Sequence, residues 1–457
     1  MIDLCGGDVR TAASGLRLFE NIVASGSLVL AKVGGTRAGE RSAHRFLSSP
    51  YVTVDGLLEA FSARTREASE GRRVVVAQDT TEINFSGRSA GRRGLGAAGD
   101  GKTPGFFIHP NVVVDADDEA VLGLAGAHIW TREEGKVGAR SQRALKDKES
   151  ARWLGNERTA AEVLVGHARQ VICVSDREGD IWGHFVHVPK GVDQVVRARH
   201  DRALEEALEG ESVLLFKALA GEPPLTITEV KVPSRGPGDK GRVARVALRA
   251  GTVRIKRPGS APRTDPEVLE IGYVEAIEQD PPEGVKKPLA WRLLTTLPVD
   301  SVDDAKEVVR LYRLRWRIEE VFRALKRDGL ALEQTQVQER ERLFRLAALG
   351  LGAAVRILQL VDARDGSPRP MSDVLDQSLV EEVAILVRAR QGATVKQQNP
   401  HPKASLAWLA WVVARYGGWN CYGKPPGPKT MADGWIRFTA ALGGVILANA
   451  NANPGIP

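Results

Sequence analysis

Apolar and polar positions near the start of the chain follow the period of amphipathic helices. Between residues 16 and 23 the apolar side chains recur every three or four positions, which places them on one helix face. Two further helices are predicted over Arg37–Leu47 and Val54–Thr65, and Asp55 is expected to cap the latter. Residues 1–65 are therefore expected to form an N-terminal helical domain.

Short apolar runs bounded by polar residues follow in the next part of the chain. Strands are predicted over four of these runs: Val74–Ala77, Phe106–Asp115, Val121–Trp130 and Gln170–Ser175. A helix is predicted over Glu157–Gln170. Asp79 and Asp176 directly follow two of the predicted strands, which is where open α/β sheets place ligands and chemistry.

Apolar and polar residues alternate from about residue 200 to residue 287, as is typical of antiparallel strands. The alternating stretches are Leu225–Val232, Arg242–Leu248, Val253–Lys256 and Val268–Ala276. We interpret them as a β unit inserted into an α/β domain.

Helical patterns dominate the last third of the chain, after a further strand at Trp291–Thr296. One long helix is predicted over Ser301–Asp328, and its first residues, Ser301-Val302-Asp303-Asp304, match a capping box. Helical periodicity returns over residues 338–363, and residues 371–457 are expected to form a C-terminal helical unit.

Composition narrows the class of protein. The chain has 457 residues and three distant cysteines, which excludes a disulfide framework and a CxxC zinc site. No apolar run approaches the roughly 18 residues of a membrane-spanning helix, and no signal pattern opens the chain, so a cytoplasmic protein without a membrane partner is expected. The net charge of +7 allows a nucleic-acid partner, provided that the cations are clustered.

One such cluster is predicted on the second helix. Arg37, Arg41 and Arg45 are four residues apart and line one helix face. A solvated surface is the ordinary interpretation of this pattern, and contact with a DNA backbone is the alternative.

The predicted helix 301–328 combines an acid with phosphate-binding residue types. On a continuous helix, Tyr312, Arg315, Glu319 and Lys326 point the same way within about 60°. A carboxylate suits a metal ion, whereas arginine and lysine suit phosphate oxygens. The alternative is a surface helix with an ordinary Arg315–Glu319 ion pair.

Asp79, Asp176 and Glu319 together form a candidate set of oxygen ligands. Such ligands suit hard cations, Mg²⁺ or Mn²⁺, and two such ions about 3.5–4 Å apart are a recurring device for phosphodiester chemistry. Near these acids, Asp180 is expected to cap a following helix, and Glu320 is expected to lie at the surface. A carboxylate-dependent glycoside hydrolase and a general nuclease remain alternatives, although the former gives no reason for the cations around Glu319.

The sequence YRLRWRIEEVFRALK, which holds Tyr312, Arg315, Glu319 and Lys326, resembles the YREK signature of bacterial cut-and-paste DDE transposases, most closely the Tn-five group. Gln78-Asp79-Thr80-Thr81 is similar to the first aspartate motif of that family, and Ser175-Asp176-Arg177-Glu178-Gly179-Asp180 is similar to the second. Near the N-terminus, Ala43-His44-Arg45-Phe46 is the best match.

The resemblance implies a ribonuclease-H-like α/β catalytic core with an inserted antiparallel β subdomain, flanked by N- and C-terminal helical domains. The implied parts are a DNA-end-binding domain (1–65), a catalytic core (66–199 and 288–364), the β subdomain (200–287) and a C-terminal dimerisation domain (371–457). Double-stranded DNA, both transposon ends and target, is the implied partner of a homodimer associated with the bacterial nucleoid.

The resemblance also implies roles for single residues. Asp79, Asp176 and Glu319 would hold two divalent ions during cleavage through a DNA hairpin and strand transfer. Phosphates of the DNA end would be bound by Tyr312, Arg315, Lys326 and Arg197. Trp291 would stack on a flipped base, although a core position at the start of a strand is equally open.

The start of the chain departs from the family pattern. Gly7-Asp8-Val9-Arg10, similar to a family GDxR motif, comes almost at the first residue, so a leading helix is expected to be missing. A catalytically impaired regulator or inhibitor of a full-length transposase is therefore the alternative function.

Overall fold

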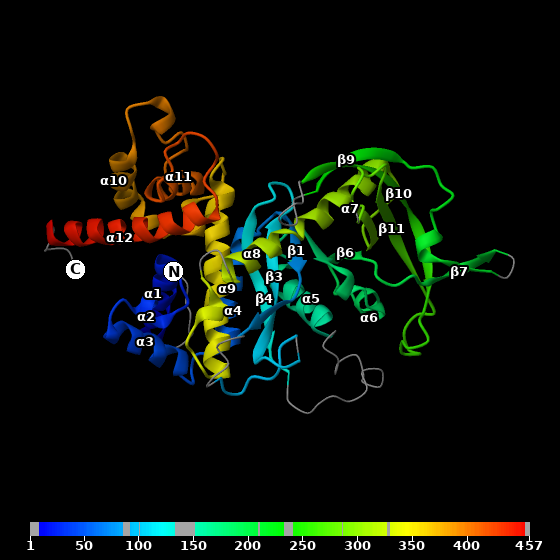
Figure 1. Ribbon diagram of the computed structural model, residues 1–457, viewed down its shortest axis with the longest axis horizontal. Coiled ribbons are helices and arrows are strands. Elements are labelled where there is room, and N and C mark those ends of the chain that lie inside the picture. Colours follow the sequence, from blue (N-terminus) through cyan, green and yellow to red (C-terminus); the bar gives the residue numbers. More distant parts are fainter. Residues whose placement is uncertain are drawn as a thin grey trace. The chain divides into compact units, whose positions relative to one another are not determined.

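The computed structural model describes residues 9–85, 92–99, 101–132, 151–208, 211–232, 241–285, 287–326 and 330–452 (Figure 1). The chain forms two compact units. We call Met1–Glu70, Thr80–Lys136 and Arg317–Pro457 the helical unit, and Gly71–Asp79 and Val137–Trp316 the sheet unit. Gly7 and Asp8 of the predicted GDxR-like motif lie outside the described residues.

The helical unit begins with the three predicted N-terminal helices and with one short helix, α2 (Leu30–Gly34), that was not predicted. The three predicted helices are α1 (Val9–Ser25), α3 (Arg37–Ser48) and α4 (Val54–Ala68). The Thr53 side chain accepts a hydrogen bond from the Gly56 backbone and caps α4, so the expected cap by Asp55 is wrong. Thr53, two residues before Asp55, has the extended backbone that a capping residue requires, whereas Asp55 is already within the first turn.

An antiparallel sheet forms the core of this unit together with a long apolar helix. Its strands are β2 (Thr81–Asn84), β3 (Gly105–Asp115) and β4 (Val121–Trp130), paired in that order. Helices α4 and α9 (Arg340–Ala363) pack on β4. Among the described residues, α9 and Pro428–Asn449 are long and apolar enough to cross a membrane, with 94% and 33% of their apolar windows buried.

Further helices complete the helical unit: α8 (Arg317–Lys326), α10 (Val380–Arg390), α11 (Leu406–Tyr416) and α12 (Pro428–Ala452). Trp408 and Trp411 of α11 are buried in the core, and Trp419 is half-buried. α11 packs against α9, α10 and α12, which explains why nearly all of its residues are buried.

The sheet unit contains one mixed sheet in the order β1-β5-β6-β12-β11-β10-β7-β8, with β9 also paired to β10. Its strands are β1 (Arg73–Gln78), β5 (Gln170–Ser175), β6 (Val192–Arg197), β7 (Ala203–Leu208), β8 (Glu211–Leu214), β9 (Thr226–Val232), β10 (Arg242–Lys256), β11 (Val268–Glu278) and β12 (Ala290–Thr295). β1, β5 and β6 are parallel, and the pairs from β6 to β10 are antiparallel. The predicted mixed α/β class is confirmed.

Two element boundaries in this unit differ from the predicted ones. β10 is one strand where two were predicted, because its pairing with β11 continues through Gly251 opposite Tyr273. Helix α5 covers Ala151–Leu164 and not Glu157–Gln170. Gly166, with a φ of 89°, lies in the turn that follows, and Gln170 already belongs to β5.

The predicted long helix is broken. Helix α7 (Val302–Leu314) begins with the predicted capping box at Ser301 and ends before Arg315, and α8 starts at Arg317. The backbone amides of Arg315 and Trp316 donate to carbonyls three residues back, at 3.2 and 3.0 Å, which tightens the chain beyond the α-helical pitch.

Because of this break, Tyr312, Arg315, Glu319 and Lys326 do not lie on one continuous helix. The boundary between the two units falls after Trp316, so Tyr312 and Arg315 belong to the sheet unit while Glu319 and Lys326 belong to the helical unit. The prediction that all four share one continuous helical face is therefore wrong, because it assumed 28 unbroken helical positions from Ser301 to Asp328.

Candidate active site

Asp79 and Asp176 lie at the same edge of the mixed sheet. β1 and β5 are adjacent and parallel, and their register places Ala77 opposite Val174. Each aspartate lies two residues beyond a member of that pair, so the two carboxylates follow neighbouring strand ends. This is the edge at which open α/β sheets hold ligands.

Arg315 binds one of these carboxylates directly. Its Nη1 donates to Asp79 Oδ2 at 2.5 Å, and the two side chains are only 15% and 16% exposed. A bond between ionised partners of this kind is about twice as strong as a neutral one. Arg315, predicted to bind a DNA phosphate, is thus engaged with a predicted metal ligand.

Tyr312 and Trp291 also lie next to each other in the sheet unit. Their rings are 5.3 Å apart in a T-shaped arrangement. Tyr312 is buried, with 4% of its surface exposed, whereas Trp291 at the start of β12 is half-buried. The pair joins the end of α7 to the sheet, and part of the Trp291 surface remains accessible.

The turn that follows Asp176 is tightly fixed. Asp176 Oδ1 accepts from the backbone amide of Glu178 at 2.8 Å, and the amide of Gly179 donates to the Asp176 carbonyl at 3.1 Å. Gly179 packs so closely that an added Cβ would lie 2.3 Å from Ser175 Oγ. The turn therefore sets the direction of the Asp176 carboxylate.

A buried network of polar side chains is hydrogen-bonded to this turn. Gln194 Nε2 donates to both oxygens of Glu157 at 2.8 Å, and His184 Nε2 lies 3.2 Å from the same carboxylate. His184 Nδ1 donates to the Gly179 carbonyl at 2.8 Å. Although burial alone lowers the pKa of His184, the Glu157 carboxylate and the Gly179 carbonyl raise it above its ordinary value. No local pattern in the sequence indicated this network, because its residues come from separate elements.

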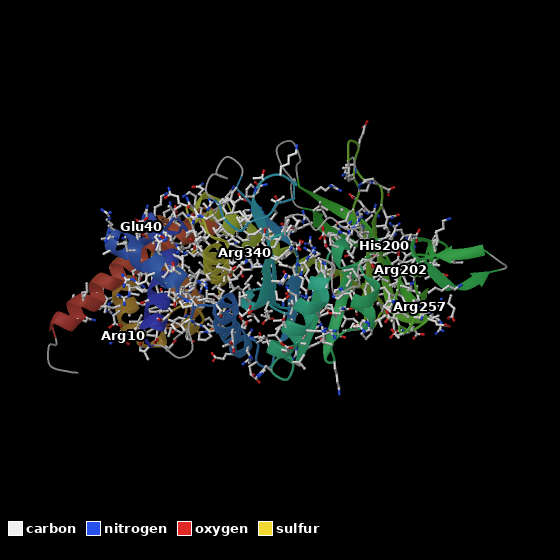
Figure 2. The ribbon with its side chains drawn as sticks, turned by 90° about the horizontal axis from the view of Figure 1, so that it is seen from below. Arg10, Glu40, His200, Arg202, Arg257 and Arg340 are labelled. Atoms are coloured by element: carbon white, nitrogen blue, oxygen red, sulfur yellow. The ribbon has the colours of Figure 1, made fainter. Side chains whose placement is uncertain are left out.

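Asp180 was expected to cap the following helix, but this prediction is wrong. Helix α6 (Trp182–Val186) has Ile181 at its cap position without a side-chain bond. Asp180 instead accepts from the backbone amides of Arg199 and His200 at 2.6 and 2.8 Å and pairs with Arg202 at 2.5 Å. His200 and Arg202 are labelled in Figure 2 on the segment that Asp180 holds.

In the helical unit, α8 carries Glu319 in its first turn and Lys326 at its end. These residues are seven positions apart and therefore share one face of α8. Lys326 Nζ donates to the Glu82 carbonyl at 2.7 Å and lies 3.7 Å from the Glu333 carboxylate. Lys326 is thus held against β2 and the segment after α8.

Glu320 is not the solvated surface residue that was expected. It pairs with Arg317, which also binds Asp362 of α9. Burial raises the pKa of the Glu320 carboxyl above its ordinary value, and Arg317 opposes that rise. The pairs fix α8 on α9 and leave Glu319, one position earlier, on another face.

Two further sets of predicted DNA contacts differ in their surroundings. Arg197, at the end of β6, is half-buried and donates to the Ala290 carbonyl at 3.0 Å. Arg37, Arg41 and Arg45 are exposed on α3 and form no ion pair with the described residues. The α3 cations are free to meet an external anion, whereas Arg197 is partly engaged.

The candidate metal ligands have suitable chemistry. All three are carboxylates, the donors that Mg²⁺ and Mn²⁺ prefer. Asp79 and Asp176 belong to the sheet unit and Glu319 to the helical unit. Among the described residues, no three His, Cys, Asp or Glu side chains are gathered closely enough to hold an ion. Their role as one metal site remains a prediction.

A comparison with protein families gives a direct match. Residues 140–356 match the family model of the transposase DDE domain, over slightly less than half of the 457 residues. The matched region contains Asp176 and Glu319, while Asp79 precedes it. The match supports a DDE transposase, an enzyme of the transposase and endonuclease type that acts on DNA and uses divalent metal ions.

Proposed function

We propose that this chain is a metal-dependent transposase that cleaves DNA at the ends of its element and joins the freed 3′-hydroxyl to target DNA. The observation that carries the proposal is the placement of Asp79 and Asp176 after neighbouring parallel strands. The transposase DDE match, which includes Glu319, supplies the reaction class.

In this proposal, Asp79, Asp176 and Glu319 hold two divalent ions, Mg²⁺ or Mn²⁺. When bound, such ions activate the attacking oxygen and stabilise the leaving oxygen of a phosphodiester. The protein contributes orientation: the turn at 176–179 directs one carboxylate, and the Glu157–His184 pair supports that turn. No covalent protein intermediate is needed, because positioning and charge stabilisation lower the barrier.

Arg315 has two successive partners in this account. Its guanidinium balances the charge of Asp79 in the structure. If the Asp79 carboxylate held a cation, its bond to Arg315 would weaken, and the Arg315 guanidinium would then be available to a DNA phosphate. Tyr312, Lys326 and Arg197 are proposed as further phosphate ligands, and the exposed Arg37, Arg41 and Arg45 of α3 as contacts to the transposon end.

Cleavage is proposed to pass through a hairpin at the DNA end. Forming a tight hairpin unstacks a base, and the half-buried Trp291 offers an aromatic surface for it. Stacking of a base on an aromatic ring contributes about 1–3 kcal/mol, which offsets part of the unstacking cost.

We further propose a ribonuclease-H-like core, a homodimer on paired DNA ends and a location at the bacterial nucleoid. The proposed domain boundaries are those predicted from the sequence: 1–65, 66–199 with 288–364, 200–287 and 371–457. The mixed α/β sheet of the sheet unit supports the first of these proposals.

The test uses purified chain and a duplex that carries the inverted repeats flanking its gene. With Mg²⁺, the unmodified chain is expected to nick at the repeat, and the alanine variants of Asp79, Asp176 and Glu319 are expected to bind without nicking. Asp303→Ala, an exposed acid paired with Lys306 on α7, is the matched control and should nick normally.

Robust nicking by any of the three variants contradicts the assignment. A chain that binds the repeat but does not nick it with either Mg²⁺ or Mn²⁺ is instead the regulator or inhibitor considered above. Cutting at random positions without strand joining identifies a general nuclease.

A further inference from the structure

One segment of the helical unit has an unusual charge composition. Residues 383–432, which we call the acid-free segment, contain no Asp or Glu, although the chain has 57 acids in 457 residues and about six are expected over this length. The segment contains seven Lys or Arg residues: Arg388, Arg390, Lys396, Lys403, Arg415, Lys424 and Lys429.

The fold brings two loops of the acid-free segment together. One loop joins α10 to α11 and the other joins α11 to α12, three helices that lie beside one another (Figure 1). The hydroxyls of Thr394 and Tyr422 are 2.9 Å apart, and Lys396 Nζ lies 5.6 Å from the centre of the Tyr422 ring. The loops therefore form one surface, on which Tyr422 is 44% exposed.

Some cations of the segment are neutralised. Lys403 pairs with Glu381, and Lys429 pairs with Asp433, both at 2.6 Å, with acids from just outside the segment. Arg415 is held by the carbonyls of Arg390 and Trp419. These side chains stabilise the helix ends and loops.

Other cations of the segment have no acidic partner within the part of the chain that the structure describes. Lys396 and Lys424 are exposed, and neither forms an ion pair with the described residues. Arg390 is also exposed, and its guanidinium lies 4.0 Å over the Tyr416 ring. We call Arg390, Lys396, Tyr422 and Lys424 the two-loop surface.

We propose that the two-loop surface binds the phosphate backbone of duplex DNA, as a site separate from the acids of the proposed active site. The proposal rests on the proposed function only in taking DNA as the partner, which the family match supports. Unpaired Lys and Arg gain from replacing the counterions of phosphates, and this gain does not depend on base sequence. The hydrogen bond between Thr394 and Tyr422 joins the two loops before DNA arrives, so less backbone conformational entropy is lost on binding.

The two classes of lysine provide a matched test. Lys396→Ala/Lys424→Ala and Lys403→Ala/Lys429→Ala each remove two positive charges from the same segment. Binding of the full chain to a duplex without repeats is measured by fluorescence anisotropy at several salt concentrations, with EDTA present to prevent cleavage. The slope of log K against log salt is negative, and losing two phosphate contacts makes it shallower by about 1.8.

We expect that reduction for the Lys396/Lys424 pair and an unchanged slope for the Lys403/Lys429 pair. Lys396→Arg/Lys424→Arg keeps both charges and should retain the original slope. Equal slopes for the two alanine pairs overturn the proposal. Since the assay requires binding alone, this result is independent of nicking: absent nicking contradicts the proposed function, and equal slopes contradict the two-loop surface.

Discussion

Gly179→Ala tests whether the turn after Asp176 has to stay where the structure places it. The new Cβ would lie 2.3 Å from Ser175 Oγ and 2.8 Å from Ser175 Cβ, closer than real contacts allow. It would also approach Trp153 Cε3 at 3.4 Å, and Trp153 is fully buried. Ser175 is the last residue of β5, so the turn itself has to move.

The expected magnitude follows from these contacts. Forcing one methyl group into a packed site costs about 1–3 kcal/mol. Displacement of Gly179 also weakens the hydrogen bond from His184 to its carbonyl, which contributes about 1 kcal/mol. We therefore expect a stability loss of about 2–4 kcal/mol. Nicking should fall by about 100-fold if Asp176 moves by about 1 Å.

Urea unfolding and the nicking rate on the repeat duplex measure the two effects. Gly155→Ala is the control, because its added Cβ on α5 meets nothing within 4 Å, and it should stabilise the helix by up to about 1 kcal/mol. Adding Ser175→Ala to Gly179→Ala removes the 2.3 Å contact and should restore part of the activity. Normal stability and normal nicking in Gly179→Ala would show that the turn can move without affecting Asp176.

Three further predictions concern the same region. Glu157→Gln should cost about 3–5 kcal/mol at acid pH, because it leaves His184 buried without its carboxylate. Since the folded pKa of His184 is raised, its contribution is complete below its unfolded pKa and is lost as pH rises through the folded pKa. Urea unfolding at pH 5.5 and 8.5 gives the difference in free energy of unfolding between this variant and the unmodified chain. That difference should be smaller at pH 8.5, and a larger difference at pH 8.5 would contradict the prediction. Arg315→Ala should lower the Mn²⁺ concentration at which Mn²⁺ binding to the chain is half-saturated, because Asp79 loses its competing guanidinium. Nicking should decline in the same variant. Weaker Mn²⁺ binding would count against competition between Arg315 and the metal ion. Trp291→Ala should slow hairpin formation about 5- to 150-fold, the equivalent of 1–3 kcal/mol of stacking, and leave the first nick unchanged; equal slowing of both steps would assign Trp291 to the core.

The sequence predicted those features of the site that depend on local pattern. Apolar runs before Asp79 and Asp176 identified the strand ends correctly, because a buried strand is continuous in sequence. The capping box at Ser301 was also predicted and is confirmed.

Features that depend on contacts between distant residues were not predictable in this way. The chain between Tyr312 and Ile318 contains neither Gly nor Pro, so nothing local indicated that α7 would stop at Leu314. Glu157 on α5 and His184 on α6 are 27 positions apart in sequence, and the packing of α5 against α6 brings them together. Arg317 likewise pairs with both Glu320 and Asp362 of α9, and Glu320 is half-buried beside them.

Asp176→Cys probes whether Asp176 holds a catalytic metal ion. A thiolate is a poor ligand for Mg²⁺ and a better one for the softer Mn²⁺. We predict that this variant fails to nick the repeat duplex in Mg²⁺ and regains nicking in Mn²⁺, while Asp176→Ala stays inactive in both. Nicking by Asp176→Cys at the normal rate in Mg²⁺, or equal loss in the two metals, would contradict direct metal binding by this residue.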